Sequence, residues 1–131
     1  ILVGAGAGIA PLAGFVRQNR PGRPAYLFLG ARDPASDFLY RRQLEGALSE
    51  NRLTSLDTAF SRVVGGQYVQ HHLAAQADEV RELVAAGAQI MVCGGLDMAR
   101  GVRAALDAAL APLSLSTAML KAQGRYLEDA Y

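Results

Sequence analysis

The sequence predicts an α/β fold: a five-stranded parallel sheet with helices on both faces. Short apolar stretches alternate with longer segments in which apolar residues recur every three or four positions, which is typical of strands separated by helices. The connections between parallel strands are almost always right-handed, and this places helices on both sides of the sheet. A length of 131 residues suits one domain with one core.

The first half of the chain predicts three strands and two helices. Ile1–Val3 is an apolar run, and Ala25–Gly30 is a second one that follows the helix-breaking segment RPGRP. A third strand is expected within Arg52–Ser61. The first helix begins near Pro11, and its apolar stripe consists of Leu12, Phe15 and Val16. Asp37 is the expected N-cap of the second helix, whose apolar face consists of Tyr40, Leu44 and Leu48.

The second half continues the alternation of helices and strands. A single helix is expected from about Tyr68 to Gly87, with an apolar face of Leu73, Ala77, Val80 and Val84. The apolar run Gln89–Gly94 predicts a fourth strand. The next helix ends at Pro112, and its apolar face consists of Met98, Val102, Leu106 and Leu110. After a short turn or helix over Ser116–Gln123, the stretch Gly124–Tyr131 predicts a fifth strand.

Composition and charge exclude several classes of protein. Apolar residues make up 51% of the chain and charged residues 19%, with no apolar run near the roughly 20 residues of a membrane span. A net charge of +1 and scattered basic residues argue against a nucleic-acid partner. A single cysteine, Cys93, permits no intrachain disulfide and is compatible with a cytoplasmic setting.

His71 and His72 point about 100° apart on a helix and are not expected to share a metal. Because Ile1 falls inside an expected strand, we expect this chain to be part of a longer protein.

A glycine-rich turn follows the first expected strand. The dinucleotide-binding pattern G-x-G-x-x-G fails there, because Ile9 and Pro11 stand where its third glycine is required. What remains is a turn with little side-chain bulk that leads into a helix, whose free N–H groups and partial positive charge suit a phosphate. The alternative is a tight connection between strand and helix that binds no ligand.

Five stretches of the chain resemble motifs of the ferredoxin-NADP+ reductase superfamily, in the same order. They are GAGAGIAPL, LFLGARDPASDFLY, AFSRVVGGQYVQH, VCGGLDMARGV and LKAQGRYLEDAY. The resemblance is narrowest to the NADPH-binding domain of the diflavin reductases, which include sulfite reductase flavoprotein and cytochrome P450 reductase. The closing stretch favours the sulfite reductase flavoprotein branch. The resemblance implies a ferredoxin reductase-like NADP-binding domain over residues 1–131, at the carboxyl end of a longer flavoprotein reductase.

The resemblance also implies a set of NADPH-binding residues: Gly6, Ala7, Gly8, Ile9, Ala10, Pro11, Arg32, Ser61, Arg62, Gln67, Tyr68, Gln70, Gly94 and Met98. Several of these suit a 2′-phosphate on chemical grounds. A hydroxyl beside a planar guanidinium, as in Ser61-Arg62, can make charge-assisted hydrogen bonds to a dianion. Arg32 stands where NAD-specific domains usually carry an acidic residue. The alternatives are a solvated loop for Arg32, and packing on the core for Tyr68 and Met98.

Three positions depart from the family pattern. Ala7 stands where the family usually has Thr, and a single lost hydrogen bond costs roughly 0.5–1.5 kcal/mol, so binding should survive. Gln67 replaces a common Lys and leaves a neutral donor. Gly95 replaces Asp or Ser. NADPH is therefore the expected nucleotide, with a weakened preference over NADH.

Three residues are implied to be catalytic: Cys93, Asp129 and Tyr131. In the family the cysteine lies near the nicotinamide, the carboxylate helps to orient it, and a terminal aromatic ring stacks on FAD, which a preceding domain binds. Without the resemblance, Cys93 is most often a buried core cysteine. The expected partners are an FAD-binding domain, an FMN-binding flavodoxin-like domain and a downstream electron acceptor. The alternative function is a nucleotide-sensing module of the same fold without catalysis.

Overall fold

The computed structural model describes residues 1–131 and contains one parallel sheet of five strands. The strands are β1 (Leu2–Ala5), β2 (Tyr26–Ala31), β3 (Ser55–Phe60), β4 (Ile90–Gly94) and β5 (Tyr126–Ala130). Their order across the sheet is β3-β2-β1-β4-β5, and every neighbouring pair is parallel. The predicted fold class is confirmed.

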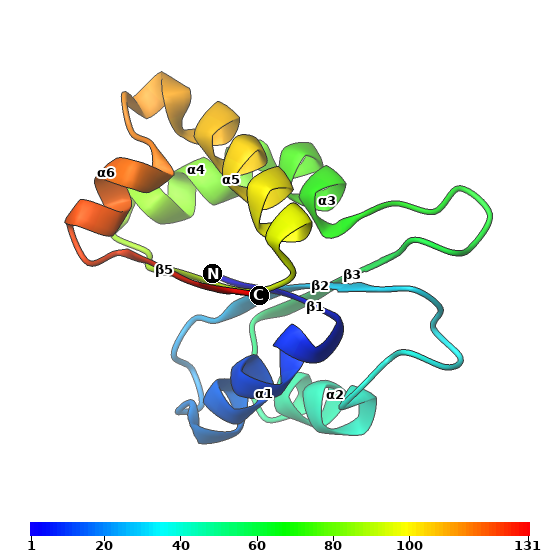
Figure 1. Ribbon diagram of the computed structural model, residues 1–131. Helices are drawn as coiled ribbons and strands as arrows, with labels where there is room; N and C mark the ends of the chain where they lie inside the picture. Colours follow the sequence, from blue (N-terminus) through cyan, green and yellow to red (C-terminus); the bar gives the residue numbers. More distant parts are fainter.

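Helices cover both faces of this sheet (Figure 1). One face carries α1 (Ile9–Gln18) and α2 (Arg41–Ser49). The opposite face carries α3 (Val69–Ala75), α4 (Ala77–Ala85), α5 (Leu96–Leu110) and α6 (Thr117–Ala122). Two short 3-10 turns, η1 (Gly6–Gly8) and η2 (Ala111–Leu113), complete the chain. None of the helices is long and apolar enough to cross a membrane.

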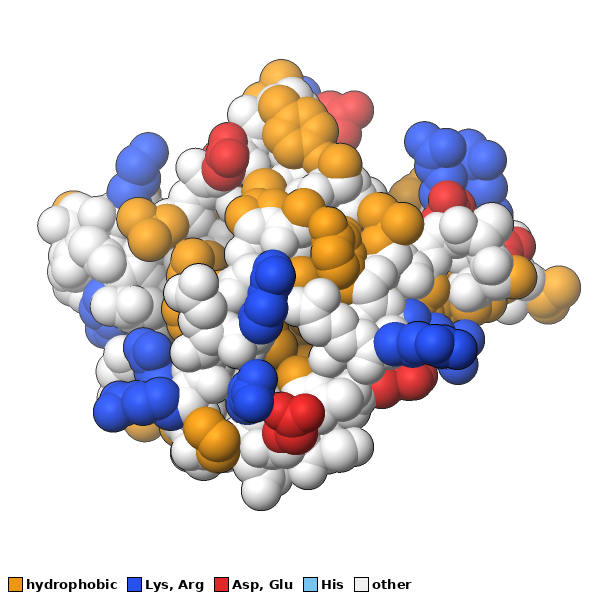
Figure 2. All heavy atoms as spheres, turned by 90° about the horizontal axis from the view of Figure 1, so that it is seen from below, with side chains coloured by type: hydrophobic (Ala, Val, Ile, Leu, Met, Phe, Trp, Pro, Cys, Tyr) orange, Lys and Arg blue, Asp and Glu red, His pale blue; other side chains and the backbone are white.

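Each face of the sheet has its own apolar core, because successive strand residues point to opposite sides. In β1, Val3 belongs to a cluster of 14 buried residues, to which the helices α3 to α6 all contribute. Its neighbour Leu2 belongs to a second cluster of 11 residues, with α1 and α2. Figure 2 shows the α1–α2 face from outside, where apolar side chains gather near the centre and basic side chains stand in separate groups. Both cores lie wholly within this chain.

One helix predicted from the sequence is in fact two. The stretch expected to run from Tyr68 to Gly87 breaks at Gln76, whose backbone leaves the helical region with φ −110° and ψ 28°. The Gln76 side chain donates a hydrogen bond to Asp57 of β3, which turns this residue toward the sheet. The apolar spacing is continuous across the break, so periodicity alone does not reveal it.

Asp37 is not the N-cap that the sequence predicts. The segment after β2 forms its own turn, in which Asp33 accepts hydrogen bonds from the amides of Ala35 and Asp37. As a result α2 begins only at Arg41, after Tyr40 in a left-handed conformation with φ 60°. The predicted apolar face is wrong at Tyr40, which is exposed, and correct at Leu44, which is buried. A left-handed residue that is not glycine is uncommon, and no apolar pattern predicts it.

The strand order reverses between β1 and β4. From β1 the chain builds outward through β2 and β3, then crosses to the other side of β1 to build β4 and β5. In sheets of this kind the loops separate at the reversal, and ligands bind beyond the carboxyl ends of the strands there. Four connections meet at that edge: the glycine turn, the segments after β2 and β3, and the turn before α5.

Candidate nucleotide-binding site

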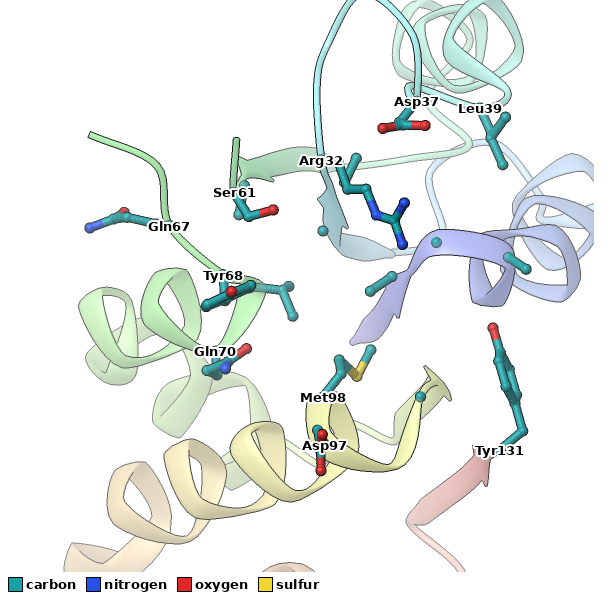
Figure 3. Close-up of a pocket in the computed structure, with 18 residues that line it drawn as sticks. Arg32, Asp37, Leu39, Ser61, Gln67, Tyr68, Gln70, Asp97, Met98 and Tyr131 are labelled. Carbon is teal, nitrogen blue, oxygen red and sulfur yellow. The ribbon is translucent and has the colours of Figure 1, made fainter. Parts of the chain in front are cut away.

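A cleft of about 750 Å³ opens at the carboxyl ends of the strands, on both sides of β1 (Figure 3). This volume lies within the roughly 300–1,000 Å³ range of cofactor and small-molecule sites. Nine of the residues singled out in the sequence line it: Gly6, Ala7, Arg32, Ser61, Gln67, Tyr68, Gln70, Met98 and Tyr131. Eight others lie outside the lining: Gly8, Ile9, Ala10, Pro11, Arg62, Cys93, Gly94 and Asp129.

The polar end of the cleft is built where β2 and β3 run on past their last paired residues. The Ser61 amide donates to the Ala31 carbonyl at 3.0 Å, and the Arg62 amide donates to the Arg32 carbonyl at 2.9 Å. This extension of the ladder sets Arg32, Ser61 and Arg62 side by side, although about 30 residues of sequence separate them. In Figure 3, Arg32 and Ser61 reach into the same space. Arg62 is exposed and does not line the cleft.

The loop between β3 and α3 folds back on itself and brings its far end to the same place. The Gln67 amide donates to the Phe60 carbonyl at 3.0 Å. Gly66 permits this closure, because a Cβ at that position would stand 2.5 Å from the Ser61 carbonyl oxygen. Tyr68 therefore lines the cleft beside Ser61, and its side chain is 59% exposed. The Gln67 amide group points away from the cleft in Figure 3.

Gln70 and Met98 each combine packing with a place on the cleft wall. The amide of Gln70 lies against Gly101 of α5, where an added Cβ would come within 2.9 Å of its Nε2. The Met98 thioether lies against Gly94, and the side chain also packs on the core beneath α5. Packing and cleft-lining roles therefore coexist in both residues.

The glycine turn leaves the start of α1 open to the cleft. Gly6 has φ +57°, with no atom within 4 Å of the position its Cβ would take. A Cβ on Gly8 would stand 2.1 Å from the Cys93 carbonyl oxygen, so only glycine lets the turn pack on the end of β4. No side chain caps α1, and no acidic residue stands in its first turn. No side chain therefore competes with an anion at this helix start, although the Ile9 amide donates to the carbonyls of Gly6 and Ala7 within the turn.

The other end of the cleft is made by β4 and β5. Cys93 and Asp129 are direct partners in the parallel ladder. Burial raises the pKa of the Cys93 thiol, and the charge of Asp129 raises it further, so the thiol is protonated at neutral pH. Only 6% of Cys93 is exposed, and it packs in the cluster beneath α1 rather than on the cleft wall. Its predicted place beside a nicotinamide stays a prediction.

Tyr131 is held at the mouth of the cleft by its backbone. Its amide donates to the Gly94 carbonyl at 3.1 Å, and its carbonyl accepts from the Leu96 amide at 3.1 Å. These two bonds fasten the end of β5 to the turn that begins α5. The side chain is 63% exposed and stands across the cleft from Arg32 in Figure 3. The main chain is thus fixed while the ring stays accessible.

The edge strand β5 is also tied to α5 through side chains. The Arg103 guanidinium donates to both carboxylate oxygens of Glu128, at 2.6 and 2.5 Å, and the Tyr126 hydroxyl donates to the same carboxylate at 2.8 Å. Burial alone would raise the pKa of Glu128, but these hydrogen bonds outweigh it and the pKa is lowered. Strand β5 is therefore anchored one residue before Asp129 and three before Tyr131.

Comparison with known proteins assigns the family. Residues 2–104 match the family described as the oxidoreductase NAD-binding domain. This match spans most of the chain and includes the glycine turn, the β2 and β3 ends and the start of α5. The chain belongs to this family.

The similar proteins are much longer than this NAD-binding domain. A self-sufficient cytochrome P450 monooxygenase from Oidiodendron maius is 40% identical over 124 residues, which cover 86% of this chain and 12% of that protein. The alpha-component of NADPH sulfite reductase flavoprotein from Photobacterium profundum is 40% identical over 112 residues, which cover 81% of this chain and 18% of that protein. A bifunctional cytochrome P450/NADPH–P450 reductase from Bacillus subtilis is 39% identical over 119 residues, which cover 83% of this chain and 11% of that protein. The resemblance to diflavin reductases is confirmed, and identity does not separate the P450 and sulfite reductase branches.

The donors around the cleft fit an adenine dinucleotide. The glycine turn at the start of α1 suits a pyrophosphate, because no side chain caps the helix and no acidic residue stands in its first turn. Arg32 and the Ser61 hydroxyl offer charge and hydrogen bonds for a second phosphate. Arg62 follows Ser61 in the chain and is exposed, with its amide bonded to the Arg32 carbonyl. The Tyr68 ring offers a flat apolar surface beside these groups. The cleft therefore carries groups suited to anions at two separate places, the start of α1 and the ends of β2 and β3.

Nine residues of the cleft wall are not among the site residues predicted from the sequence: Ala5, Gly30, Ala31, Asp37, Leu39, Ala59, Val69, Gly95 and Asp97. Most are small residues at strand ends, which carry no chemical signal of their own. A Cβ on Gly30 would lie 3.3 Å from the Cβ atoms of Ala5 and Val69, so the floor is closely packed. Asp37 and Leu39 were missed because the segment that bears them was assigned to the start of a helix. Their position right after Arg32, in a loop at a strand's carboxyl end, was the available signal.

Proposed function

We propose that this chain is the NADPH-binding domain of a flavoprotein oxidoreductase, and that it presents the nicotinamide of NADPH to FAD bound by another domain. NADPH supplies the hydride, and the chain supplies orientation and electrostatics. The main support is the set of polar side chains at the adjoining ends of β2 and β3. Arg32 and Ser61 meet there beside Arg62, next to the exposed ring of Tyr68.

The 2′-phosphate of NADPH is the group assigned to this polar end. A dianion beside Ser61 and two guanidinium groups gains charge-assisted hydrogen bonds that a ribose hydroxyl cannot match. The pyrophosphate lies over Gly6, Ala7 and the start of α1, while Ile9, Ala10 and Pro11 shape the helix behind it. Gly8 and Gly94 fill the close contact between the turn and β4. Gln67, Gln70 and Met98 act as side walls.

The flavin end of the domain is assigned to Tyr131, Asp129 and Cys93. The exposed ring of Tyr131 stacks on FAD until the nicotinamide displaces it. Asp129 orients the nicotinamide by its charge, from the strand position opposite Cys93. A buried, protonated Cys93 thiol positions the ring rather than attacking it. This arrangement needs an FAD-binding domain to cover the exposed tyrosine.

The parent protein is assigned to the diflavin reductases, with this chain as its carboxyl-terminal domain. Support comes from similar proteins that are several times longer and named as P450 reductase fusions or a sulfite reductase flavoprotein. An FMN-binding flavodoxin-like domain then receives electrons from FAD and passes them to a haem or iron–sulfur acceptor. The carboxyl-terminal stretch favours the sulfite reductase flavoprotein branch, and the setting is cytoplasmic.

The decisive experiment compares two fragments of the nucleotide. Calorimetric titration of the chain with 2′,5′-ADP and with 5′-AMP isolates the 2′-phosphate from the rest of the ligand. We expect 2′,5′-ADP to bind at least ten times more tightly, since each charge-assisted hydrogen bond contributes roughly 1.5–3 kcal/mol. Equal affinities would point to NADH or another adenine nucleotide. Binding of neither fragment would overturn the assignment of the cleft.

A second candidate function is a nucleotide-sensing module without catalysis. The burial of Cys93 away from the cleft wall favours it, as do Ala7, Gln67 and Gly95, which lack the family's polar groups. The rate of FAD reduction by NADPH in the parent protein separates the two functions. A fast rate that is lost when Asp129 is changed to Ala supports the reductase. No detectable rate, with normal binding of 2′,5′-ADP, supports the sensor.

A further inference from the structure

We infer that His71 is a positioning residue: it holds Tyr68 in place at the polar end of the nucleotide cleft, whereas the adjacent His72 does not. This inference rests on the proposed function for its consequence, nucleotide binding, but the contact itself can be tested without any nucleotide. His71 does not line the cleft and carries no role in the assignments above.

The backbone of Tyr68 is held by the His71 side chain. Tyr68 stands just before α3, in an extended conformation with φ −93° and ψ 162°. Its amide donates a hydrogen bond of 3.0 Å to Nδ1 of His71, while the His71 amide donates to the Tyr68 carbonyl at 3.0 Å. Because Nδ1 accepts, the proton of the neutral imidazole is on Nε2. This reciprocal pair does the work of a capping box, in which the third helical residue usually is Glu or Gln.

The ring of Tyr68 is in contact with the same histidine. The two ring centroids are 5.7 Å apart, with planes tilted by 44°, a normal geometry for an aromatic pair. Tyr68 is otherwise 59% exposed and comes at the end of an exposed loop. A side chain in that setting would sample several rotamers. His71 therefore fixes both the main chain and the ring of Tyr68, which lines the cleft together with Arg32 and Ser61.

His72 provides a matched contrast on the same helix. Adjacent helical residues point about 100° apart, and His72 faces the sheet instead of Tyr68. Its Nδ1 is hydrogen-bonded to Asp57 of β3, and the second oxygen of that carboxylate accepts from Gln76. This group joins α3 to the edge strand. Loss of His72 should therefore lower stability without changing the orientation of Tyr68.

The test uses four variants: His71→Ala, His71→Gln, His71→Phe and His72→Ala. Gln at this position can accept from the Tyr68 amide as in an ordinary capping box, whereas Phe keeps a ring but no acceptor. Two quantities are measured for each: hydrogen exchange of the Tyr68 amide by NMR without ligand, and the dissociation constants of 2′,5′-ADP and 5′-AMP by calorimetry. The melting temperature reports any general loss of stability.

We expect exchange of the Tyr68 amide to accelerate at least tenfold in His71→Ala and His71→Phe, and to return near the wild-type rate in His71→Gln. We expect His71→Ala to weaken 2′,5′-ADP by about five- to tenfold, the effect of one hydrogen bond and one ring contact. His71→Gln should recover part of this affinity. His72→Ala should lower the melting temperature while the affinity for 2′,5′-ADP changes less than about twofold.

Three outcomes would overturn the inference. One is unchanged exchange of the Tyr68 amide in His71→Ala. Another is equal loss of affinity in His71→Ala and His72→Ala, in proportion to their melting temperatures, which would indicate a structural role only. The third is unaltered 2′,5′-ADP affinity in His71→Ala. Failure of the proposed function looks different: wild-type protein would not distinguish 2′,5′-ADP from 5′-AMP, while the exchange rates would still report on the contact.

Discussion

The two ends of the cleft are built in different ways. At the polar end, Arg32, Arg62 and Tyr68 project exposed side chains from loops that follow β2 and β3. At the other end, Cys93 is buried in the core, and Tyr131 is fastened to the β4–α5 turn by two backbone hydrogen bonds. The first end works through side chains that are free of the core. The second depends on main-chain geometry that the sheet fixes.

We expect the polar end to determine which nucleotide binds, and the other end to determine how the nicotinamide is aligned. Exposed polar side chains can be replaced with little effect on folding, because surface substitutions usually change stability by less than about 0.5 kcal/mol. Gly8, where the glycine turn packs against the end of β4, cannot be replaced in this way, because a Cβ there would stand 2.1 Å from a backbone carbonyl oxygen. Substitutions at the polar end should therefore change which nucleotide binds. Substitutions where the turn meets β4 should change whether the domain folds and binds at all.

The largest effect is expected for Gly8→Ala. The new Cβ would stand 2.1 Å from the Cys93 carbonyl oxygen and 2.9 Å from the Gly94 amide nitrogen, both backbone atoms that cannot give way. We expect a loss of about 3 kcal/mol or more in the free energy of unfolding, with weaker binding of both 2′,5′-ADP and 5′-AMP. Urea unfolding and calorimetry measure the two effects.

Gly14→Ala is the matched control for this substitution. Gly14 lies inside α1, where the nearest atom to an added Cβ is the flexible end of Arg17 at 3.7 Å. Alanine in a helix interior is more stable than glycine by about 0.5–1 kcal/mol, so this variant should gain stability. If Gly8→Ala proved as harmless as Gly14→Ala, the packing of the turn against β4 would not govern the site.

The next effect is expected at the polar end. Removal of the guanidinium in Arg62→Ala should weaken 2′,5′-ADP by roughly ten- to hundredfold and leave 5′-AMP nearly unchanged, since only the 2′-phosphate loses a charge-assisted partner. In the parent protein the same change should weaken NADPH far more than NADH. The melting temperature should stay constant, because Arg62 is exposed.

Arg20→Ala removes the same charge at an exposed position after α1, away from the cleft lining. It should leave both affinities unchanged, which separates a local contact from a general effect of net charge. Equal weakening of 2′,5′-ADP and 5′-AMP by Arg62→Ala would contradict its assignment to the 2′-phosphate and leave Arg32 as the remaining cation at that end.

The sequence predicted the sheet well because strand and helix patterns are local. Five apolar runs and their helical separators are visible one at a time, and each run lies at its expected place. The errors at Asp37 and at Gln76 arise from hydrogen bonds that apolar periodicity does not encode: a local turn closed by Asp33, and a bond from Gln76 to Asp57 on β3. Asp33 accepts the hydrogen bonds that close a turn before α2. Asp57 of β3 accepts a hydrogen bond from Gln76, at the point where the predicted helix divides into α3 and α4.

The candidate site was predicted unevenly for a related reason. Arg32 and Ser61 could be named because polar groups at strand ends are conspicuous in a sequence. The small residues of the floor, such as Ala5 and Gly30, gain their role only when the strands are side by side. The sequence predicts His71 as a helix residue, but it does not predict the role of its side chain, which depends on the hydrogen bond from the Tyr68 amide. Spacing shows which residues share an edge, but not which atoms meet.

A smaller and opposite effect is expected for Tyr131→Ala. The backbone bonds to Gly94 and Leu96 do not require the ring, so stability and the affinity for 2′,5′-ADP should change less than about twofold. In the parent flavoprotein, loss of the ring removes the group that the nicotinamide must displace. The rate with NADH should therefore rise severalfold relative to that with NADPH.

Leu127→Ala is the matched control for the tyrosine, because Leu127 is also exposed on β5 and lies away from the cleft lining. It should alter neither affinity nor nucleotide preference. An unchanged ratio of NADH to NADPH rates in Tyr131→Ala would count against stacking on the flavin. It would also leave the preference between NADH and NADPH to the polar end of the cleft alone.

The smallest effect concerns Cys93 and Asp129, which are partners across β4 and β5. Burial raises the pKa of Cys93 first, and Asp129 raises it second, so Asp129→Asn should lower that pKa while leaving it above the value of an exposed thiol. Alkylation by iodoacetamide across a pH series, followed by mass spectrometry, gives the midpoint for the native chain and for the chain unfolded in urea. We expect the native midpoint to lie above the unfolded one, and to move toward it in Asp129→Asn. Equal native midpoints in the two proteins would mean that the Asp129 charge does not reach the thiol. The carboxylate opposite Cys93 would then be too well solvated to orient a nicotinamide by charge, and alignment at this end of the cleft would rest on packing alone.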